Sequence, residues 1–271
     1  MAVKVAHLPG GLKRVDHDGV VLIERRDPKT AFAFTERTGG VSEVPYASLN
    51  LGTHVGDDPF AVEENRRRVL EALGVPAEDA DNLLVPNQVH GDNVVCVRES
   101  GADYLEDVRE QLAEGADSIV CTVPHVPVML CYADCVPVVI VCPGGFAIAH
   151  SGWKGSLARI AGKTVRALSE VTGVSPSEMK AFIGPHILGD EYEVSQDLVK
   201  TFSLQFANID GSGSRLLDLS CAIRQSLEED GVLPCEIYDP GLSTMRLGDR
   251  FYSYRREAGT CGRHAAVGVM L

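Results

Sequence analysis

Three consecutive apolar segments constrain the fold of this chain more than any other feature. They run from Val126 to Cys131, from Val136 to Cys142 and from Phe146 to His150, and they are rich in β-branched residues. A strand with one face in water alternates apolar and polar residues, whereas these segments are apolar at nearly every position. We therefore predict strands that are buried on both faces, in a sheet that other layers cover.

Helix signals alternate with strand signals along the whole length. Residues 57–59 supply capping acids and a first-turn proline, ahead of an apolar face that ends at Gly74. Further helices are predicted from about Ser156 to Thr172 and from Leu217 to Asp230, each followed by a glycine. Further strands are predicted at Ala31–Thr35, Ala181–Ile183, Arg250–Tyr254 and Ala265–Leu271. We expect one α/β domain over residues 1–271.

The composition is that of a globular protein, and it excludes several classes. The chain of 271 residues has 25 Lys or Arg and 38 Asp or Glu, a formal net charge of −13. Neutralising phosphates needs clustered cations, so this balance argues against a general nucleic-acid binder. No apolar run approaches the ~20 residues that cross a bilayer, and the N-terminus lacks a secretory signal. We expect a cytoplasmic protein without membrane contact, as a monomer or weak homo-oligomer.

The eight cysteines do not form a recognisable framework, although four of them lie between residues 121 and 142. Disulfide frameworks are typical of short secreted chains, and no pair has the C-x-x-C spacing of a zinc ribbon. Free cysteines are mostly small packing residues, and Cys131 and Cys142 lie within apolar segments where that role is natural. A cysteine with a chemical role therefore needs a partner from elsewhere in the chain.

Three side chains that suit a metal lie where predicted strands end. His90 belongs to NQVHG, Cys135 to ADCVP and His150 to AHSGWKG. Ligands usually bind at strand ends in α/β proteins. Imidazole and thiolate are natural zinc ligands, and three protein ligands plus water is the usual catalytic arrangement. Without a metal, Cys135 and His150 would form a nucleophile–base pair, and the residues alone do not separate the two hypotheses.

Glycine-containing loops carry candidate anion-binding groups. The segment 152–155 begins a helix and contains Lys154, so its backbone N–H groups could hold an anion. Arg37 and Arg263 lie in loops of the same character, and the alternative for each is a solvated surface charge. None of these glycine spacings matches the P-loop or the dinucleotide-binding fingerprint.

Several motifs occur in a fixed order between Phe32 and Leu271. They are FTERTGGVS, SLNLGTHVGDDP, ENR, NQVHG, GADS, ADCVP, AHSGWKG, IGP and FYSYRR. With them the chain resembles the bacterial polyphenol oxidase or laccase-domain family, whose members are regarded as purine nucleoside phosphorylases. The resemblance implies a four-layer α/β (α+β) sandwich of mixed β-sheets flanked by helices. It also implies a catalytic zinc on His90, Cys135 and His150.

The resemblance implies an activity as well. It is phosphorolysis of adenosine, inosine and S-methyl-5'-thioadenosine, with adenosine deaminase activity in addition, so the expected partners are purine nucleosides and phosphate. Arg37 matches the arginine of the family's T-x-R-x-GGVS signature and Asn50 the asparagine of its NLG turn. With Lys154 and Arg263, these are the candidate substrate- or phosphate-binding residues.

The sequence departs from the family pattern at two places. Lys154 stands where the family usually has arginine in HAGWRG, which keeps the charge but loses the bidentate fork. The segment 189–194 keeps YEV but has acids in place of the cysteine of the family's CCYEV segment. We therefore expect that oxyanion recognition at Lys154 differs from that of the family's arginine. We also expect no role for a fourth thiol in the segment 189–194.

Three other functions remain open. Multicopper oxidases commonly use H-x-H pairs, and the eight histidines form none. A copper-dependent polyphenol oxidase would therefore depend on a single copper in the N/S site. A metal-free hydrolase or amidase would use Cys135 and His150, and the family fold resembles that of a toxin deamidase with a Cys–His pair. A non-catalytic protein would bind nucleosides without turnover.

Overall fold

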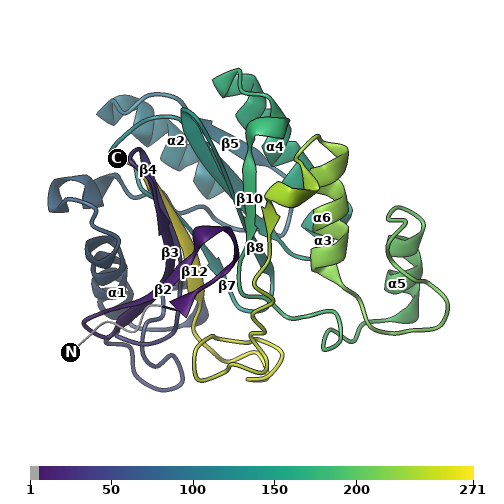
Figure 1. Ribbon diagram of the computed structural model, residues 1–271. Coiled ribbons are helices and arrows are strands. Elements are labelled where there is room, and N and C mark those ends of the chain that lie inside the picture. The colour runs from purple at the N-terminus through teal and green to yellow at the C-terminus, as the bar shows by residue number, and fades with distance from the viewer. Residues whose placement is uncertain (1–5) are drawn as a thin grey trace.

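Two six-stranded sheets pack face to face at the centre of the molecule (Figure 1). The computed structural model describes residues 6–271. In the first sheet every neighbouring pair is antiparallel, and its strands are, in order, β1 (Ala6–His7), β2 (Lys13–His17), β3 (Val20–Arg26), β4 (Thr30–Thr35), β12 (His264–Met270) and β7 (Val128–Tyr132). The last strand of the chain, β12, therefore lies between β4 and β7 in this sheet.

The second sheet is mixed, with a parallel pair at each edge and antiparallel pairs between them. Its strands are, in order, β11 (Ile237–Tyr238), β10 (Lys180–Ile183), β8 (Val136–Cys142), β9 (Gly145–Ser151), β6 (Ser118–Cys121) and β5 (Val94–Val97). All residues of β8 and β9 are buried, as the sequence predicts. Val139 and Val141 pack towards the first sheet, while Val138 and Ile140 pack against helices on the other side.

Helices cover the outer faces of both sheets and complete four layers (Figure 1). Helix α1 (Pro59–Ala72) packs on the first sheet, and α4 (Ile160–Thr172) and α6 (Leu219–Glu229) pack on the second. The remaining α-helices are α2 (Ala102–Glu114), α3 (Trp153–Leu157) and α5 (Gln196–Ser203). Short 3-10 helices are η1 (Pro9–Gly11), η2 (Thr53–Val55), η3 (Ala77–Asn82), η4 (Pro176–Glu178) and η5 (Pro234–Glu236). The expected layered sandwich is confirmed.

Most predicted elements are present. The helices α1 and α6 begin where the sequence predicts because an aspartate caps the N-terminus of each. The Asp58 side chain accepts a hydrogen bond from the Phe60 N–H, and the Asp218 side chain caps α6 in the same way through Cys221. Such caps satisfy N–H groups that have no partner within the helix. Across residues 6–271 no helix is long and apolar enough to span a membrane.

Two predictions about elements are wrong. The single helix expected from Ser156 to Thr172 is two helices, α3 and α4, because Arg159 takes a left-handed conformation with φ of 61°. The strand expected at Arg250–Tyr254 is a series of turns, in which Arg250 and Phe251 donate backbone hydrogen bonds to the Leu247 carbonyl. Both aromatic residues are nonetheless buried: Phe251 belongs to the core between the sheets, and the Tyr252 hydroxyl donates to the Tyr46 carbonyl.

Candidate metal centre and active site

The structure brings His90, Cys135 and His150 together. His150 lies in β9, Cys135 lies in the turn between β7 and β8, and His90 lies in the loop before β5. Their ligand atoms all lie within 4.8 Å of one another, and the two imidazole centroids are 4.7 Å apart. His150 is buried, Cys135 is half-buried and His90 is exposed. The cluster therefore opens to solvent on the His90 side.

A strained turn presents Cys135 to the histidines. Asp134 has a φ of 91°, which is unfavourable for a residue with a side chain. Its carboxylate accepts hydrogen bonds from Thr244 Oγ1 at 2.6 Å and from the Arg255 N–H at 2.7 Å. Its carbonyl accepts a third from the Ile187 N–H at 3.1 Å. Contacts from three distant segments thus hold the turn in place.

Asp117 orients the His150 ring and holds the backbone of the loop that carries His90, and the sequence analysis does not identify it. It is fully buried, and its Oδ1 lies 2.7 Å from Nδ1 of His150 and 3.0 Å from the backbone nitrogen of His90. Its Oδ2 accepts from the N–H groups of Gly91 and Val89. A histidine that binds a metal usually donates its other ring nitrogen to such a carboxylate. The available signal was the acid in the GADS motif, directly before a buried strand.

Gly152 allows the close approach at the cluster. A Cβ atom placed on it would lie 3.1 Å from Cδ2 of His90 and 3.2 Å from Sγ of Cys135. A Cβ on Gly155 would lie 2.8 Å from the Gly91 carbonyl oxygen. Any side chain at these positions would displace the loop that carries His90. The GWKG sequence is therefore a packing requirement of the site.

Electrostatics favour a charged thiolate–imidazolium pair. Burial by itself would raise the pKa of Cys135, but the charge of the neighbouring His150 outweighs it and lowers that pKa to about 6. Burial opposes the charge of His150 too, yet the Cys135 thiolate and the Asp117 carboxylate raise its pKa to about 9. A thiolate at neutral pH suits both a metal ligand and a nucleophile.

The donor set fits a zinc ion. Two imidazoles and a thiolate are preferred zinc ligands, and bonds of about 2.0–2.3 Å place tetrahedral donors roughly 3.3–3.8 Å apart. The three donor atoms lie within 4.8 Å of one another, so a shift of about 1 Å at most would bring them to that separation. Because Nδ1 of His150 faces Asp117, Nε2 of the same ring is the atom left for a metal. We conclude that this cluster can hold a metal with three protein ligands.

Arg37 and Asn50 hold loops together. The Arg37 guanidinium donates to the carbonyls of Ala47 and Gly248, pairs with Glu257 at 3.0 Å and stacks 4.2 Å from the Tyr252 ring centroid. Asn50 is fully buried. Its Oδ1 accepts the N–H groups of Gly52 and Arg263, and its Nδ2 donates to Gly52 and Asp57. These polar groups are thus largely engaged within the protein.

Lys154 and Arg263 are placed differently. Lys154 lies two residues after Gly152, makes no ion pair with any residue of the described range, and has its Nζ 5.5 Å from the Trp153 ring centroid. Arg263 packs its side chain against Gly52, and its Nη1 donates to the carbonyls of Cys261 and Gly262. Lys154 is therefore the freer of the two cations.

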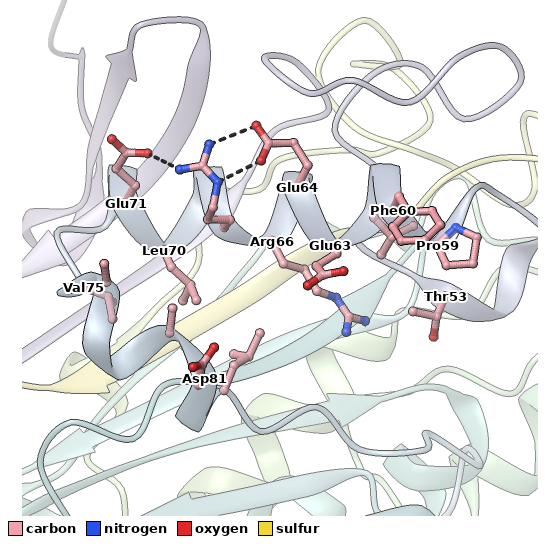
Figure 2. Close-up of a pocket in the computed structure, with 15 residues that line it drawn as sticks. Thr53, Pro59, Phe60, Glu63, Glu64, Arg66, Leu70, Glu71, Val75 and Asp81 are labelled. Carbon is pink, nitrogen blue, oxygen red and sulfur yellow. Dashed lines mark hydrogen bonds and ion pairs between the residues drawn. The ribbon is translucent and has the colours of Figure 1, made fainter.

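A separate cavity of about 900 Å³ lies between α1 and η3 on the outer side of the first sheet (Figure 2). Leu70 and Val75 line it with Arg66 and Asp81, and Arg67 bridges Glu64 and Glu71 at its rim. The three residues of the metal cluster are not among those lining it. This cavity and the His90–Cys135–His150 cluster are thus different places.

Comparison with known proteins agrees with the geometry. Residues 31–271 match the family model described as multi-copper polyphenol oxidoreductase laccase. The chain belongs to this family. A purine nucleoside phosphorylase of Deinococcus radiodurans is 37% identical over 254 residues, which cover 92% of each chain. A purine nucleoside phosphorylase of Corynebacterium glutamicum is 33% identical over 90% of this chain and 96% of its own.

Solved structures of the family have the same fold. The hypothetical protein YfiH of Bacillus licheniformis superposes with a TM-score of 0.83 at 29% identity, covering 94% of this chain and 98% of its own. YlmD of Geobacillus stearothermophilus superposes with a TM-score of 0.80 at 31% identity, covering 93% and 96%. The four-layer arrangement is therefore that of the family.

Proposed function

We propose that this protein is a zinc-dependent purine nucleoside phosphorylase for adenosine, inosine and S-methyl-5'-thioadenosine, with adenosine deaminase activity. The observation that carries the proposal is the His90–Cys135–His150 cluster, in a chain whose curated relatives are named purine nucleoside phosphorylases. Phosphorolysis converts a nucleoside and phosphate into the free base and ribose 1-phosphate. Deamination converts adenosine and water into inosine and ammonia.

The protein's own residues have distinct roles in this proposal. Cys135 Sγ, Nε2 of His150 and a ring nitrogen of His90 would hold the metal. Asp117 orients the His150 imidazole and accepts the backbone N–H of His90. When bound, zinc supplies a Lewis acid and lowers the pKa of water. Lys154 and Arg263 supply positive charge for substrate or phosphate, while Arg37 and Asn50 fix the loops around Arg263.

One observation favours a second candidate. Cys135, His150 and Asp117 form a thiolate–imidazolium–carboxylate series, with 2.7 Å between Nδ1 of His150 and Oδ1 of Asp117. A nucleophile, a base and a group that orients the base is the usual arrangement for covalent catalysis. A metal-free hydrolase or amidase would use Cys135 as nucleophile and His150 as base.

Metal analysis combined with turnover separates the two candidates. We expect about one zinc per chain in the purified protein, and inosine turnover that requires both phosphate and metal. Chelation should abolish turnover, and zinc should restore it better than copper. Cys135→Ser should lose the metal and lower kcat/KM by about 10³-fold or more, as expected when a metal ligand or nucleophile is lost. Cys235→Ser, at an exposed cysteine outside the cluster, is the matched control.

Three other outcomes of these experiments would contradict the zinc-dependent phosphorylase. Full inosine phosphorolysis by metal-free protein would refute the zinc-dependent mechanism. The second candidate would be established by two results together. Metal-free wild type would hydrolyse an amide and lose this activity on thiol alkylation, and Cys135→Ser would hydrolyse no amide. Stoichiometric nucleoside binding without turnover at any metal loading would contradict both enzymatic proposals.

A further inference from the structure

Arg255 lies directly beside the turn that carries Cys135. Its backbone N–H donates to Oδ2 of Asp134 at 2.7 Å, so the residue is tied to the neighbour of a cluster residue. Its Nη1 donates to the Glu193 carbonyl at 2.9 Å, and its guanidinium carbon lies 5.4 Å from the Tyr192 ring centroid. These contacts place the backbone of this exposed residue beside the Cys135 turn and its guanidinium against the segment 192–193.

The guanidinium of Arg255 is held in place but is not neutralised. Among residues 6–271 it pairs with no carboxylate, and neither Nε nor Nη2 has a hydrogen-bond partner there. The nearby Asp134 carboxylate receives the Arg255 backbone N–H and the Thr244 hydroxyl. An arginine beside an aromatic ring, with Nε and Nη2 free to donate, can bind two oxygens of a phosphate.

Tyr192 connects this cation to the cluster. The ring is half-buried, and burial followed by the negative charge of Cys135 raises the pKa of its hydroxyl, while Arg255 opposes that shift. The segment that carries Tyr192 also contacts the Cys135 turn, because the Ile187 N–H donates to the Asp134 carbonyl and the Tyr192 N–H donates to the Leu188 carbonyl. The Tyr192 ring therefore places the guanidinium 5.4 Å from its centroid in a segment joined to that turn.

The adjacent arginine has a different environment. The Arg256 guanidinium donates to the Met245 carbonyl at 3.0 Å and packs against Gly248, where a Cβ would lie 1.8 Å from its Nη1. It therefore faces the 245–248 loop and makes none of the contacts that join Arg255 to the Cys135 turn. The two arginines of the FYSYRR motif have the same charge but different surroundings.

We propose that Arg255, supported by Tyr192, binds inorganic phosphate at the rim of the His90–Cys135–His150 cluster. The inference rests on the proposed phosphorolysis and adds the residue that receives the co-substrate. It also assigns the recognition of oxygen pairs to an arginine fork, which Lys154 lacks. Because the net charge is −13, a local cation without a carboxylate partner favours the approach of a dianion.

Substitution of the two arginines tests the proposal. Arg255→Gln should raise the phosphate KM about 10–100-fold, the effect of losing hydrogen bonds to a charged ligand, and should leave the inosine KM and metal content within twofold. Arg255→Lys should recover part of the loss, and Tyr192→Leu should raise the phosphate KM by less than Arg255→Gln does. Arg256→Gln is the matched control and should leave the phosphate KM unchanged. Equal phosphate KM values in Arg255→Gln and wild type would overturn the proposal.

Calorimetric titration with inorganic phosphate separates this inference from the proposed reaction. Metal-loaded wild type and Arg256→Gln should bind phosphate, and Arg255→Gln should bind it about 10–100-fold more weakly. Phosphate binding that depends on Arg255 in a protein without phosphorolysis would refute only the proposed function. Phosphorolysis with phosphate binding that is equal in all three proteins would refute only the role of Arg255.

Discussion

Two buried histidines on opposite sides of one tyrosine show opposite chemistry. The Tyr132 ring centroid lies 5.4 Å from that of His150 and 6.3 Å from that of His264. Both histidines are almost completely buried. His150 has Asp117 at Nδ1 and Cys135 nearby, and its pKa is raised to about 9. Neither ring nitrogen of His264 has a hydrogen-bond partner among residues 6–271, and burial lowers its pKa to about 3.

The difference shows that partners, and not burial, decide what a buried histidine can do. Burial opposes the charged form of both rings. Only at His150 do negative groups overcome that penalty. Without a metal ion at its Nε2, the His150 imidazole is therefore charged and oriented, whereas His264, beside the same tyrosine, is neutral.

Among the substitutions that test this comparison, we expect the largest effect when the Asp117 carboxylate beside His150 is removed, and the quantity affected is the metal affinity. In Asp117→Asn the amide cannot accept from Nδ1 of His150 and from three backbone N–H groups with the strength of a carboxylate. We expect metal affinity to fall about 10–100-fold, as for other carboxylates behind metal-binding histidines. Competition with a chromophoric chelator measures the affinity, and thermal unfolding shows whether the fold is retained.

A second histidine–carboxylate pair provides the control. His125 Nδ1 lies 2.8 Å from Oδ2 of Asp79, and neither residue belongs to the cluster. Asp79→Asn should leave metal affinity unchanged. Equal metal affinity in Asp117→Asn and wild type would show that Asp117 has only a structural role.

The cluster could be predicted from the sequence because its members stand out locally. His90, Cys135 and His150 are polar residues at strand ends, within motifs of a recognisable family. Asp117 lies in the GADS motif, but that motif does not reveal its role, which depends on contacts with residues 26 to 33 positions away. A single acid before an apolar strand looks the same whether it faces solvent or accepts hydrogen bonds from an imidazole and a loop backbone.

The arginines show the same limit. Nothing in a glycine-rich loop distinguishes an arginine that binds a ligand from Arg37, whose donors meet carbonyls 211 residues away. Likewise, the sequence at 250–254 looks like a strand, although its burial depends on tertiary contacts such as the hydrogen bond from the Tyr252 hydroxyl to the Tyr46 carbonyl. Local patterns predict elements that local forces form, and they miss roles that tertiary contacts create.

The neutral state of His264 should make the protein less stable in acid. Between pH 6.5, the ordinary histidine pKa, and about pH 3, the unfolded chain binds a proton that the folded protein does not. The free energy of unfolding therefore falls as pH falls, by about 1.4 kcal/mol per pH unit below 6.5 from this group. Above pH 6.5 the ring is neutral in both states, and the effect disappears.

The variant His264→Leu tests whether His264 lowers the unfolding free energy in acid. In this variant the pH-dependent loss that His264 causes should disappear. Leucine is similar in volume and leaves no buried nitrogen without a partner, so we expect no loss of stability at pH 7.5. Between pH 7.5 and 5.0 the wild type should lose about 2 kcal/mol more unfolding free energy than the variant. Urea unfolding at both pH values measures it, and His7→Leu, which removes an exposed ring on β1, controls for the loss of one histidine. Parallel losses in wild type and His264→Leu would mean that His264 is protonated in the folded protein, and the contrast with His150 would then fail.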